Sequence, residues 1–182
     1  MENIEKENIK KEIIISGINN RYQMKRLTQE RQIMKKKDAD KIEKQYFNHT
    51  NQVEYLSNAI TNASLLEEHI YKVQIKHKIS NYKQQDLLKK IYDETKFISF
   101  IEVIELLHAC KLNCFYCQQN VFILYEIIRE NKQWTLDRID NDKGHNKDNV
   151  VISCLECNLQ RKKTAKDSFF FQKNFKIIRE GL

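Results

Sequence analysis

The chain has 182 residues, enough for one domain or for one small domain with an extension. No apolar run approaches the ~20 residues that a membrane-spanning helix needs, and the opening stretch MENIEKENIKKE lacks the apolar core of a signal peptide. We therefore expect an intracellular protein with no membrane partner. The formal net charge of +7 favours a polyanionic partner, and the abundance of Lys, Asn and Ile is typical of an AT-rich genome, such as that of a virus or mobile element.

The first half of the chain has a helical pattern. Residues 1–20 show no clear period, and we expect them to form a mobile N-terminus. Residues 21–96 are expected to be a helical region whose role the sequence does not indicate. A thin apolar stripe over residues 21–60 predicts helix and leaves open a homodimer through these N-terminal helices. Ser64 and Glu67 match a capping box, which predicts the start of another helix.

Further elements lead up to the first cysteines. Residues 82–95 are expected to be helical, and Ser99 with Glu102 forms a second capping box ahead of an apolar helical face. Beyond Cys117 the pattern changes, and the apolar run over residues 121–125 is rich in residues that favour strands. We therefore place a boundary near residue 96.

Two strands and a helix are predicted in the last third of the chain. Residues 134–139 form the first predicted strand and residues 150–153 the second. A basic segment that begins at Asn158 predicts a helix. The whole pattern therefore predicts an α+β protein, in which a helical N-terminal region precedes a small strand-containing domain over residues 97–182.

Four cysteines form two matched pairs, Cys114-x2-Cys117 and Cys154-x2-Cys157. A CxxC turn directs two thiolates at one point, and two such turns supply the tetrahedral sulfur set that zinc prefers. Zinc binding of ~10–16 kcal/mol would stabilise a region with a small core. The alternative is four unrelated cysteines. Cys110 lies outside the pattern, and we expect it to be a buried helix residue.

The segment between the cysteine pairs carries polar residues that structural zinc does not explain. Asp137 lies in the first predicted strand and Asn158 directly follows Cys157, so together they could supply two oxygen ligands to a hard cation such as Mg²⁺. Asn149 precedes the second strand, where its amide can hold the turn closed. Gly144 is the one glycine between residues 17 and 181, which predicts a backbone with positive φ at this position.

The stretch LDRIDNDKGHNKDNVVISCLECN, followed by LQRKK, resembles the HNH endonuclease family in the form whose ββα-metal finger is held by two CxxC pairs. The resemblance covers roughly residues 97–172. It implies an HNH nuclease domain that hydrolyses DNA phosphodiester bonds, with a structural zinc and a catalytic Mg²⁺ or Mn²⁺. By the same resemblance, Asp137 and Asn158 bind the catalytic ion, and Asn149 is the structural middle residue of the motif.

One position departs from the family pattern. The residue after the metal-binding aspartate is usually a histidine that serves as general base, and here it is Arg138, which cannot accept a proton at neutral pH. Arg138 could instead neutralise the scissile phosphate. Our first candidate for the base is His145, because its ordinary pKa lies near physiological pH. Tyr116 and Asp140 are lesser candidates, and an equally weighted alternative is that His145 only bonds the loop backbone.

The basic segment after the second cysteine pair predicts contacts with DNA phosphates, through Arg161, Lys162, Lys163 and Lys166. We expect Phe169, Phe170 and Phe171 to pack against the helical part of the protein. Two alternatives to a DNA endonuclease stay open. The first is a catalytically inactive, zinc-stabilised module that binds nucleic acid, and the second is a helical interaction protein with a zinc-stabilised end.

Overall fold

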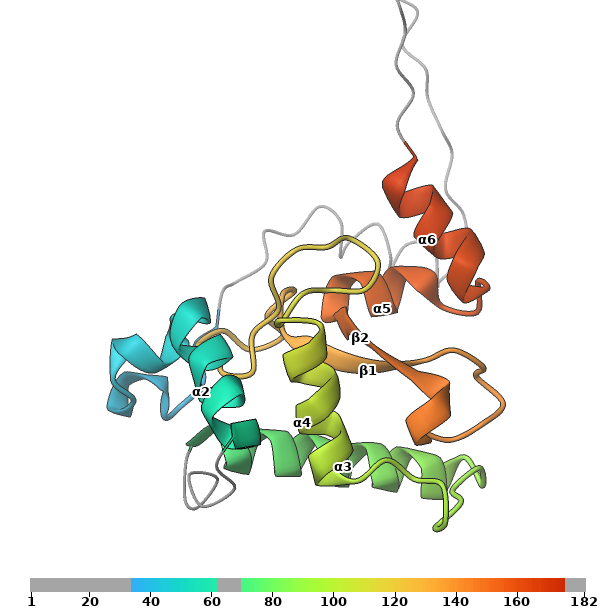
Figure 1. Ribbon diagram of the computed structural model, residues 1–182, viewed down its shortest axis with the longest axis horizontal. Helices are drawn as coiled ribbons and strands as arrows, with labels where there is room; N and C mark the ends of the chain where they lie inside the picture. Colours follow the sequence, from blue (N-terminus) through green and yellow to red (C-terminus); the bar gives the residue numbers. More distant parts are fainter. Residues whose placement is uncertain (1–33, 62–69, 176–182) are drawn as a thin grey trace, which may run out of the picture. The chain divides into compact units, whose positions relative to one another are not determined.

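The computed structural model describes residues 34–61 and 70–175, which belong to one compact unit (Figure 1). The described elements combine helices with a two-stranded antiparallel sheet, so the protein is of the α+β class. In chain order they are η1 (Ala39–Lys41), η2 (Lys44–Phe47), α2 (His49–Thr61), α3 (Ile70–Leu88), α4 (Phe100–Ala109), β1 (Trp134–Arg138), η4 (Lys147–Asn149), β2 (Val150–Cys154), α5 (Leu155–Arg161) and α6 (Lys166–Asn174).

One hydrophobic core joins the helices to the hairpin. Leu56 of α2, Ile75 of α3 and Leu107 of α4 are fully buried in the same cluster as Trp134 and Leu136 of β1. Burial of large apolar side chains is the main favourable term in folding. The division predicted near residue 96 therefore does not coincide with a break in the packing, because α2 and α3 share their core with the hairpin.

The N-terminal part differs in detail from the sequence prediction. Within the range 21–60, α2 begins only at His49, and the chain before it forms turns and short 3₁₀ helices from residue 34 onward. The mobile end over residues 1–20, the capping box at Ser64 and any homodimer contact before residue 34 lie outside the described residues.

The helix predicted over residues 82–95 is the last part of the longer α3, which ends at Leu88. Lys90 adopts a positive φ of 57°, and the N–H of Ile91 donates to the carbonyl of Asp86 at 3.0 Å. This pairing satisfies a free carbonyl at the helix C-terminus, as in a Schellman motif. The chain thereby turns back toward α4, and Asp86 lies in the last turn of α3.

The second predicted capping box is confirmed at the start of α4. The Ser99 hydroxyl accepts from the N–H of Glu102 at 3.3 Å, and the Glu102 carboxylate accepts from the N–H of Ser99 at 2.8 Å. Val103, Ile104 and Leu107 form the buried face of this helix. The capped helix leads directly into the first cysteine pair.

The apolar run over residues 121–125, whose residues favour strands, forms an irregular segment with isolated bridges. The fully buried side chain of Gln52 in α2 provides the hydrogen bonds that a neighbouring strand would otherwise supply. Its carboxamide oxygen accepts from Ile123 N–H at 2.7 Å and from Leu124 N–H at 3.1 Å, and its Nε2 donates to the Leu124 carbonyl at 3.1 Å. Buried backbone groups need such partners.

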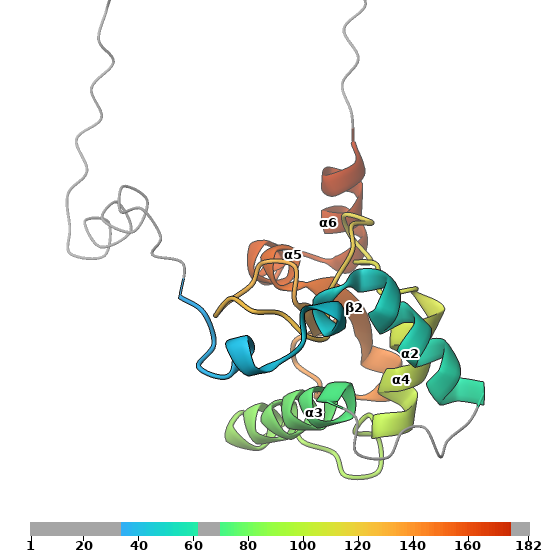
Figure 2. The same cartoon turned by 90° about the vertical axis from the view of Figure 1, so that its left-hand side faces the viewer.

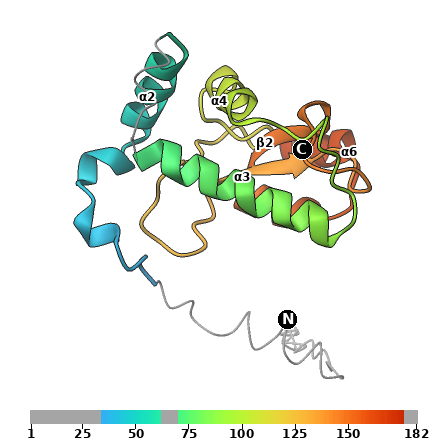
Figure 3. The same cartoon turned by 90° about the horizontal axis from the view of Figure 1, so that it is seen from below.

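The predicted hairpin is confirmed, with β1 antiparallel to β2 and Asp137 opposite Val151. Side chains alternate along a strand, so Thr135 and Asp137 point to one face while Leu136 and Arg138 point to the other. The ribbons place α5 on one side of the hairpin and α3 on the opposite side in two views (Figures 1 and 2). The view from below also places α3 across the hairpin (Figure 3).

The predicted C-terminal helix is divided in two. Helix α5 begins at Leu155, earlier than Asn158, and ends at Arg161, because Lys162 adopts a positive φ of 52°. Helix α6 follows, and its Phe169 ring packs on the Tyr116 ring with centroids 4.9 Å apart. Among the described residues no helix is both long and apolar enough to cross a membrane.

Candidate metal centre and hairpin site

Four cysteine sulfurs, from Cys114, Cys117, Cys154 and Cys157, all lie within 4.8 Å of one another. Four sulfurs at ~2.3 Å from a tetrahedral zinc ion are about 3.8 Å apart. The sulfurs of Cys117 and Cys154 are 3.9 Å apart, so the spacing and the donor chemistry both fit zinc. The cluster is therefore a candidate zinc site. Cys110 lies outside it and donates from Sγ to the Leu107 carbonyl at 3.3 Å.

Two local backbone features direct these sulfurs at one point. In the first pair, Cys114 N–H donates to the Gln119 carbonyl at 2.9 Å, and this closes a tight turn around Cys117. In the second pair, Cys154 caps α5, and its sulfur accepts from the N–H of Cys157 at 3.3 Å. Amide N–H groups at a helix N-terminus favour a thiolate. The first turn is bonded to β2 and the second continues it, so a bound ion would tie both to the hairpin.

The four thiols need a cation to ionise together. Hydrogen bonds from the thiols of Cys154 and Cys157 lower the pKa of Cys114, so one thiolate forms readily. That thiolate raises the pKa of Cys154 to about 12, and it raises the pKa of Cys157 as well. Further ionisation without a counter-charge is therefore opposed by repulsion between the sulfurs, and zinc would supply the missing positive charge.

Asp137 is buried on the α5 face of β1 and forms an ion pair with Arg161. The guanidinium Nε donates to Oδ2 at 2.6 Å, and Nη2 donates to Oδ1 at 2.9 Å. The Tyr116 hydroxyl also donates to Oδ2, at 2.7 Å. Burial and the neighbouring carboxylate raise the pKa of Tyr116, so Tyr116 is a proton donor here and is poorly suited to act as the base.

Asn158 lies on the same face of the hairpin but contacts a different residue. Its Nδ2 donates to the Thr135 hydroxyl at 3.1 Å. Thr135 and Asp137 are two residues apart on β1, which corresponds to about 7 Å along a strand. Helix α5 thus places Asn158 by Thr135 and Arg161, one turn later, by Asp137.

These residues do not fit a divalent ion in the arrangement observed. A carboxylate and a carboxamide are suitable oxygen donors for Mg²⁺, but both oxygens of Asp137 are already bound by Arg161. Within residues 34–61 and 70–175, the four cysteines form the one group of three or more thiol, imidazole or carboxylate side chains that could share an ion. An ion at Asp137 would require the guanidinium of Arg161 to move away.

His145 is placed on the opposite face of the hairpin, toward α3. Its backbone N–H donates to Oδ2 of Asp86 at 2.6 Å, and its Nδ1 lies 2.8 Å from Oδ1 of the same carboxylate. The Tyr82 ring packs on the imidazole, with centroids 4.5 Å apart. Burial lowers the pKa of His145, although Asp86 opposes this effect.

Gly144 is required for a different reason from the one predicted. Its φ lies outside the left-handed region, but a Cβ at this position would lie 2.7 Å from the Ile91 carbonyl oxygen and 2.9 Å from Oδ2 of Asp86. The glycine therefore permits close approach of the hairpin loop to the end of α3.

Asn149 closes the hairpin loop, as the sequence predicted. Its Nδ2 donates to the carbonyls of Asp140 and Gly144, each at 2.9 Å, and its Oδ1 accepts from the N–H of Asp140 at 2.9 Å. Asp140 itself is partly exposed, and its Oδ1 accepts from the N–H of Asp142 at 3.0 Å. These bonds define the loop between the strands.

The predicted phosphate-binding cations lie in two environments. Lys162 and Lys163 are exposed after α5, and Lys166 is half-buried, 5.5 Å from the centre of the Phe115 ring. Arg161, in contrast, is 1% exposed and is held by Asp137, so the expected surface role does not match its position. Arg138 is also buried, and it donates to the Lys143 carbonyl at 3.2 Å while lying 3.9 Å from Asp86.

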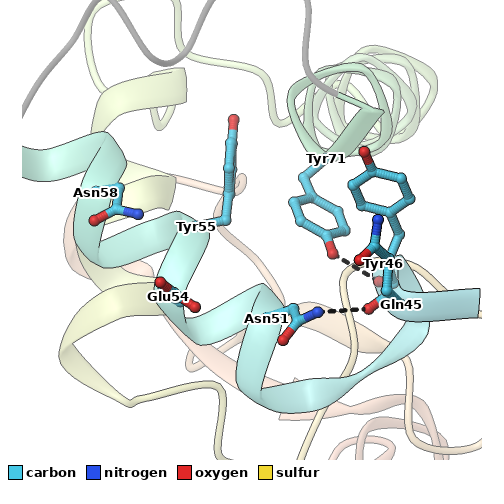
Figure 4. A pocket seen from close by; sticks show the side chains of 7 residues that line it. All are labelled: Gln45, Tyr46, Asn51, Glu54, Tyr55, Asn58 and Tyr71. Atoms are coloured by element: carbon cyan, nitrogen blue, oxygen red, sulfur yellow. Dashed lines mark hydrogen bonds between the residues drawn. The ribbon is translucent and has the colours of Figure 1, made fainter.

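A hollow of about 340 Å³ lies elsewhere, between α2, η2 and the start of α3 (Figure 4). Tyr46, Tyr55 and Tyr71 line it together with amide side chains. The hydroxyl of Tyr71 donates to the Tyr46 carbonyl at 2.7 Å, and Asn51 Nδ2 donates to the Gln45 carbonyl at 3.0 Å. None of the residues predicted to bind metal or DNA lines this hollow.

Two features of the site were missed from the sequence. The partner of Asp137 was missed because Arg161 stands in a basic run that favours an exposed interpretation. Asp86 was missed because it is 59 residues from His145. A signal existed for Asp86, since Ile75, Ile79, Tyr82 and Asp86 follow one helical face and an acid on such a face is unusual.

Comparisons with protein-family models, with curated proteins and with solved structures found no significant match to this chain. The evidence for a metal site at the four cysteines of this α+β protein is therefore the chemistry and spacing of the cysteines themselves.

Proposed function

We propose that the chain is a DNA endonuclease that nicks or cleaves phosphodiester bonds, with a structural zinc ion at the four cysteines. The observation that carries the proposal is the packing of α5 on the hairpin. One helix, held at its N-terminus by the cysteine centre, presents Asn158 to the β1 face that carries Asp137. This matches the hairpin-plus-helix arrangement that the resemblance of residues 134–163 implies.

The proposal requires a divalent ion, Mg²⁺ or Mn²⁺, and assigns its ligands to Asp137 and Asn158 in a state in which Arg161 has left the carboxylate. The exposed Lys162 and Lys163 are assigned to phosphate contacts that position DNA without reading its sequence. A guanidinium released from Asp137 would add positive charge beside the phosphate.

Cutting of supercoiled plasmid by zinc-loaded protein tests the proposal. We expect nicked or linear products with Mg²⁺ or Mn²⁺, and none in the same zinc-containing buffer without either ion, a control that avoids stripping zinc with a chelator. Asn158→Ala should reduce the rate by at least about 10–100-fold, the loss that removal of even an outer-shell partner of a metal ion causes. Gln160→Ala, an exposed amide on the same helix, is the matched control. An uncut plasmid, or full activity of Asn158→Ala, would contradict the proposal.

A second function is favoured by one observation, the buried pair between Asp137 and Arg161. If that pair is permanent, the chain is a zinc-stabilised module that binds nucleic acid without cutting it. Such a module would retain DNA at low salt, with affinity falling steeply as salt rises, and would leave plasmid intact with either ion. A helical interaction protein, the third alternative, would not retain DNA even at low salt.

A further inference from the structure

The carboxylate of Asp86 is fully buried in the last turn of α3, in a region to which the sequence assigned no role. A buried charge is costly unless it is paired and hydrogen-bonded. Most of the bonding of Asp86 is directed at one residue, because its two oxygens accept from the backbone N–H of His145 at 2.6 Å and from the imidazole Nδ1 at 2.8 Å. The Arg138 guanidinium, 3.9 Å from Oδ1, supplies the balancing positive charge.

This geometry determines the form of the imidazole. Because Nδ1 donates to Asp86, the neutral ring carries its proton on Nδ1 and leaves a lone pair on Nε2. No described residue bonds Nε2, and Nε2 is not among the fully buried atoms that lack a partner. His145 is only 3% exposed, so Nε2 retains a small contact with solvent, while the Tyr82 ring and Asp86 hold the rest of the side chain.

Burial is the main reason that the neutral form of the ring is favoured. Burial lowers the pKa of His145, Asp86 raises it, and Arg138 and Lys89 lower it again. These charges come from β1, from α3 and from Lys89 directly after α3, and the Tyr82 ring of α3 also packs on the imidazole. A neutral imidazole with a free nitrogen is the form that accepts a proton.

We propose that Asp86 is a positioning residue that holds His145 with Nε2 ready to accept a proton in the cutting reaction. The inference rests on the proposed endonuclease function and deepens it, because it gives α3 a part in the site. Arg138, which stands where a base is expected, cannot accept a proton and is adjacent to this pair. Asp137 and Arg138 are the last two residues of β1 and point to opposite faces of the hairpin, and the loop that carries His145 begins directly after them.

His145 Nε2 takes a proton from water as the water oxygen bonds to phosphorus, and the bond from phosphorus to the leaving 3′ oxygen breaks. The imidazolium then returns its proton through solvent to that oxygen. The Asp86 carboxylate compensates the imidazolium charge.

The pH dependence of plasmid cutting by Asp86→Asn tests this role. Asparagine keeps the size of the side chain but removes the charge that raises the pKa of His145. We expect the acid limb of the pH–rate profile to move to lower pH by about 1–2 units, and the rate on the plateau to fall by about 10-fold. Asp148→Asn, an exposed loop acid, is the matched control and should leave the profile unchanged. An unchanged profile in Asp86→Asn would overturn the proposal even if the wild-type protein cuts DNA.

Two measurements separate this proposal from the proposed function and from a folding defect. Nitrogen NMR of the zinc-loaded wild-type protein should show the Nδ1–H form of His145 whether or not the protein cuts DNA, and an Nε2–H form would overturn the proposal. His145→Ala should lose cutting and regain at least part of it when imidazole is added. A folded His145→Ala that cuts at the wild-type rate would also overturn it. Absence of any wild-type cutting, with the Nδ1–H form present, would refute the endonuclease function and with it the positioning role of Asp86.

Discussion

Removal of the Asp137 carboxylate should lower the free energy of unfolding of the protein, independently of any effect on catalysis. Asp137→Ala leaves the guanidinium of Arg161, which is 1% exposed, without its two bonds to the carboxylate. Removing one partner of a buried ion pair typically costs ~3–5 kcal/mol. At about 2–4 °C per kcal/mol for a domain of this size, the melting temperature should fall by about 10 °C.

Urea denaturation at pH 7 and at a fixed zinc concentration measures the effect. Trp134 is the one tryptophan of the chain and is fully buried, so its fluorescence reports unfolding of the hairpin. The single variants Asp137→Ala and Arg161→Ala should each lose about 3 kcal/mol, because each leaves a buried charge. The double variant should lose much less than the sum, with a coupling energy of ~2–3 kcal/mol.

The matched control is Lys162→Met, which removes an exposed charge next to Arg161 and should change the stability by less than ~0.5 kcal/mol. Strictly additive losses for Asp137→Ala and Arg161→Ala would refute the buried pair. The pair also affects how activity data are interpreted. A loss of cutting in Asp137→Ala alone would not identify a metal ligand, because the fold is weakened as well.

Three further predictions follow from other parts of the molecule. Gly144→Ala should lower stability by ~1–3 kcal/mol in the same urea assay, because its Cβ would lie 2.7 Å from the Ile91 carbonyl oxygen; an unchanged midpoint would show that the loop does not approach α3 this closely. Burial lowers the pKa of Lys78 from its ordinary value of 10.5 to about 7. Between these two pH values the unfolded chain binds more protons than the folded one, so the free energy of unfolding rises with pH. Lys78→Met should remove this rise, and an equal slope of stability against pH in both proteins would contradict the prediction. Cys110→Ser should keep one zinc ion per chain by metal analysis while Cys157→Ser loses it, and the reverse result would mean that the ligand set is different.

The sequence was most informative where one short pattern determines a local structure. The CxxC spacing anticipated the convergence of four sulfurs, and the strand-like patterns over residues 134–139 and 150–153 anticipated the hairpin. The serine–glutamate pair at the start of α4 anticipated its capping box. Each of these depends on residues close together in the chain, so a sequence pattern is sufficient.

Features that depend on distant residues were not accessible in this way. The apolar run over residues 121–125 has strand character, but whether it forms a strand depends on a partner, and here Gln52 of α2 takes that place. Arg161 looks like a surface cation until its partner on β1 is known. The contact of Asp86 with His145 exists only because the fold packs α3 against the hairpin loop, so the sequence alone could not predict it.

X-ray absorption at the zinc edge of the purified, metal-replete protein shows directly whether one ion joins the hairpin, α5 and the first cysteine turn, as the convergence of the four sulfurs indicates. We expect one zinc ion per chain with four sulfur neighbours at about 2.3 Å. Oxygen or nitrogen neighbours in place of any sulfur, or a folded protein without stoichiometric metal, would contradict it.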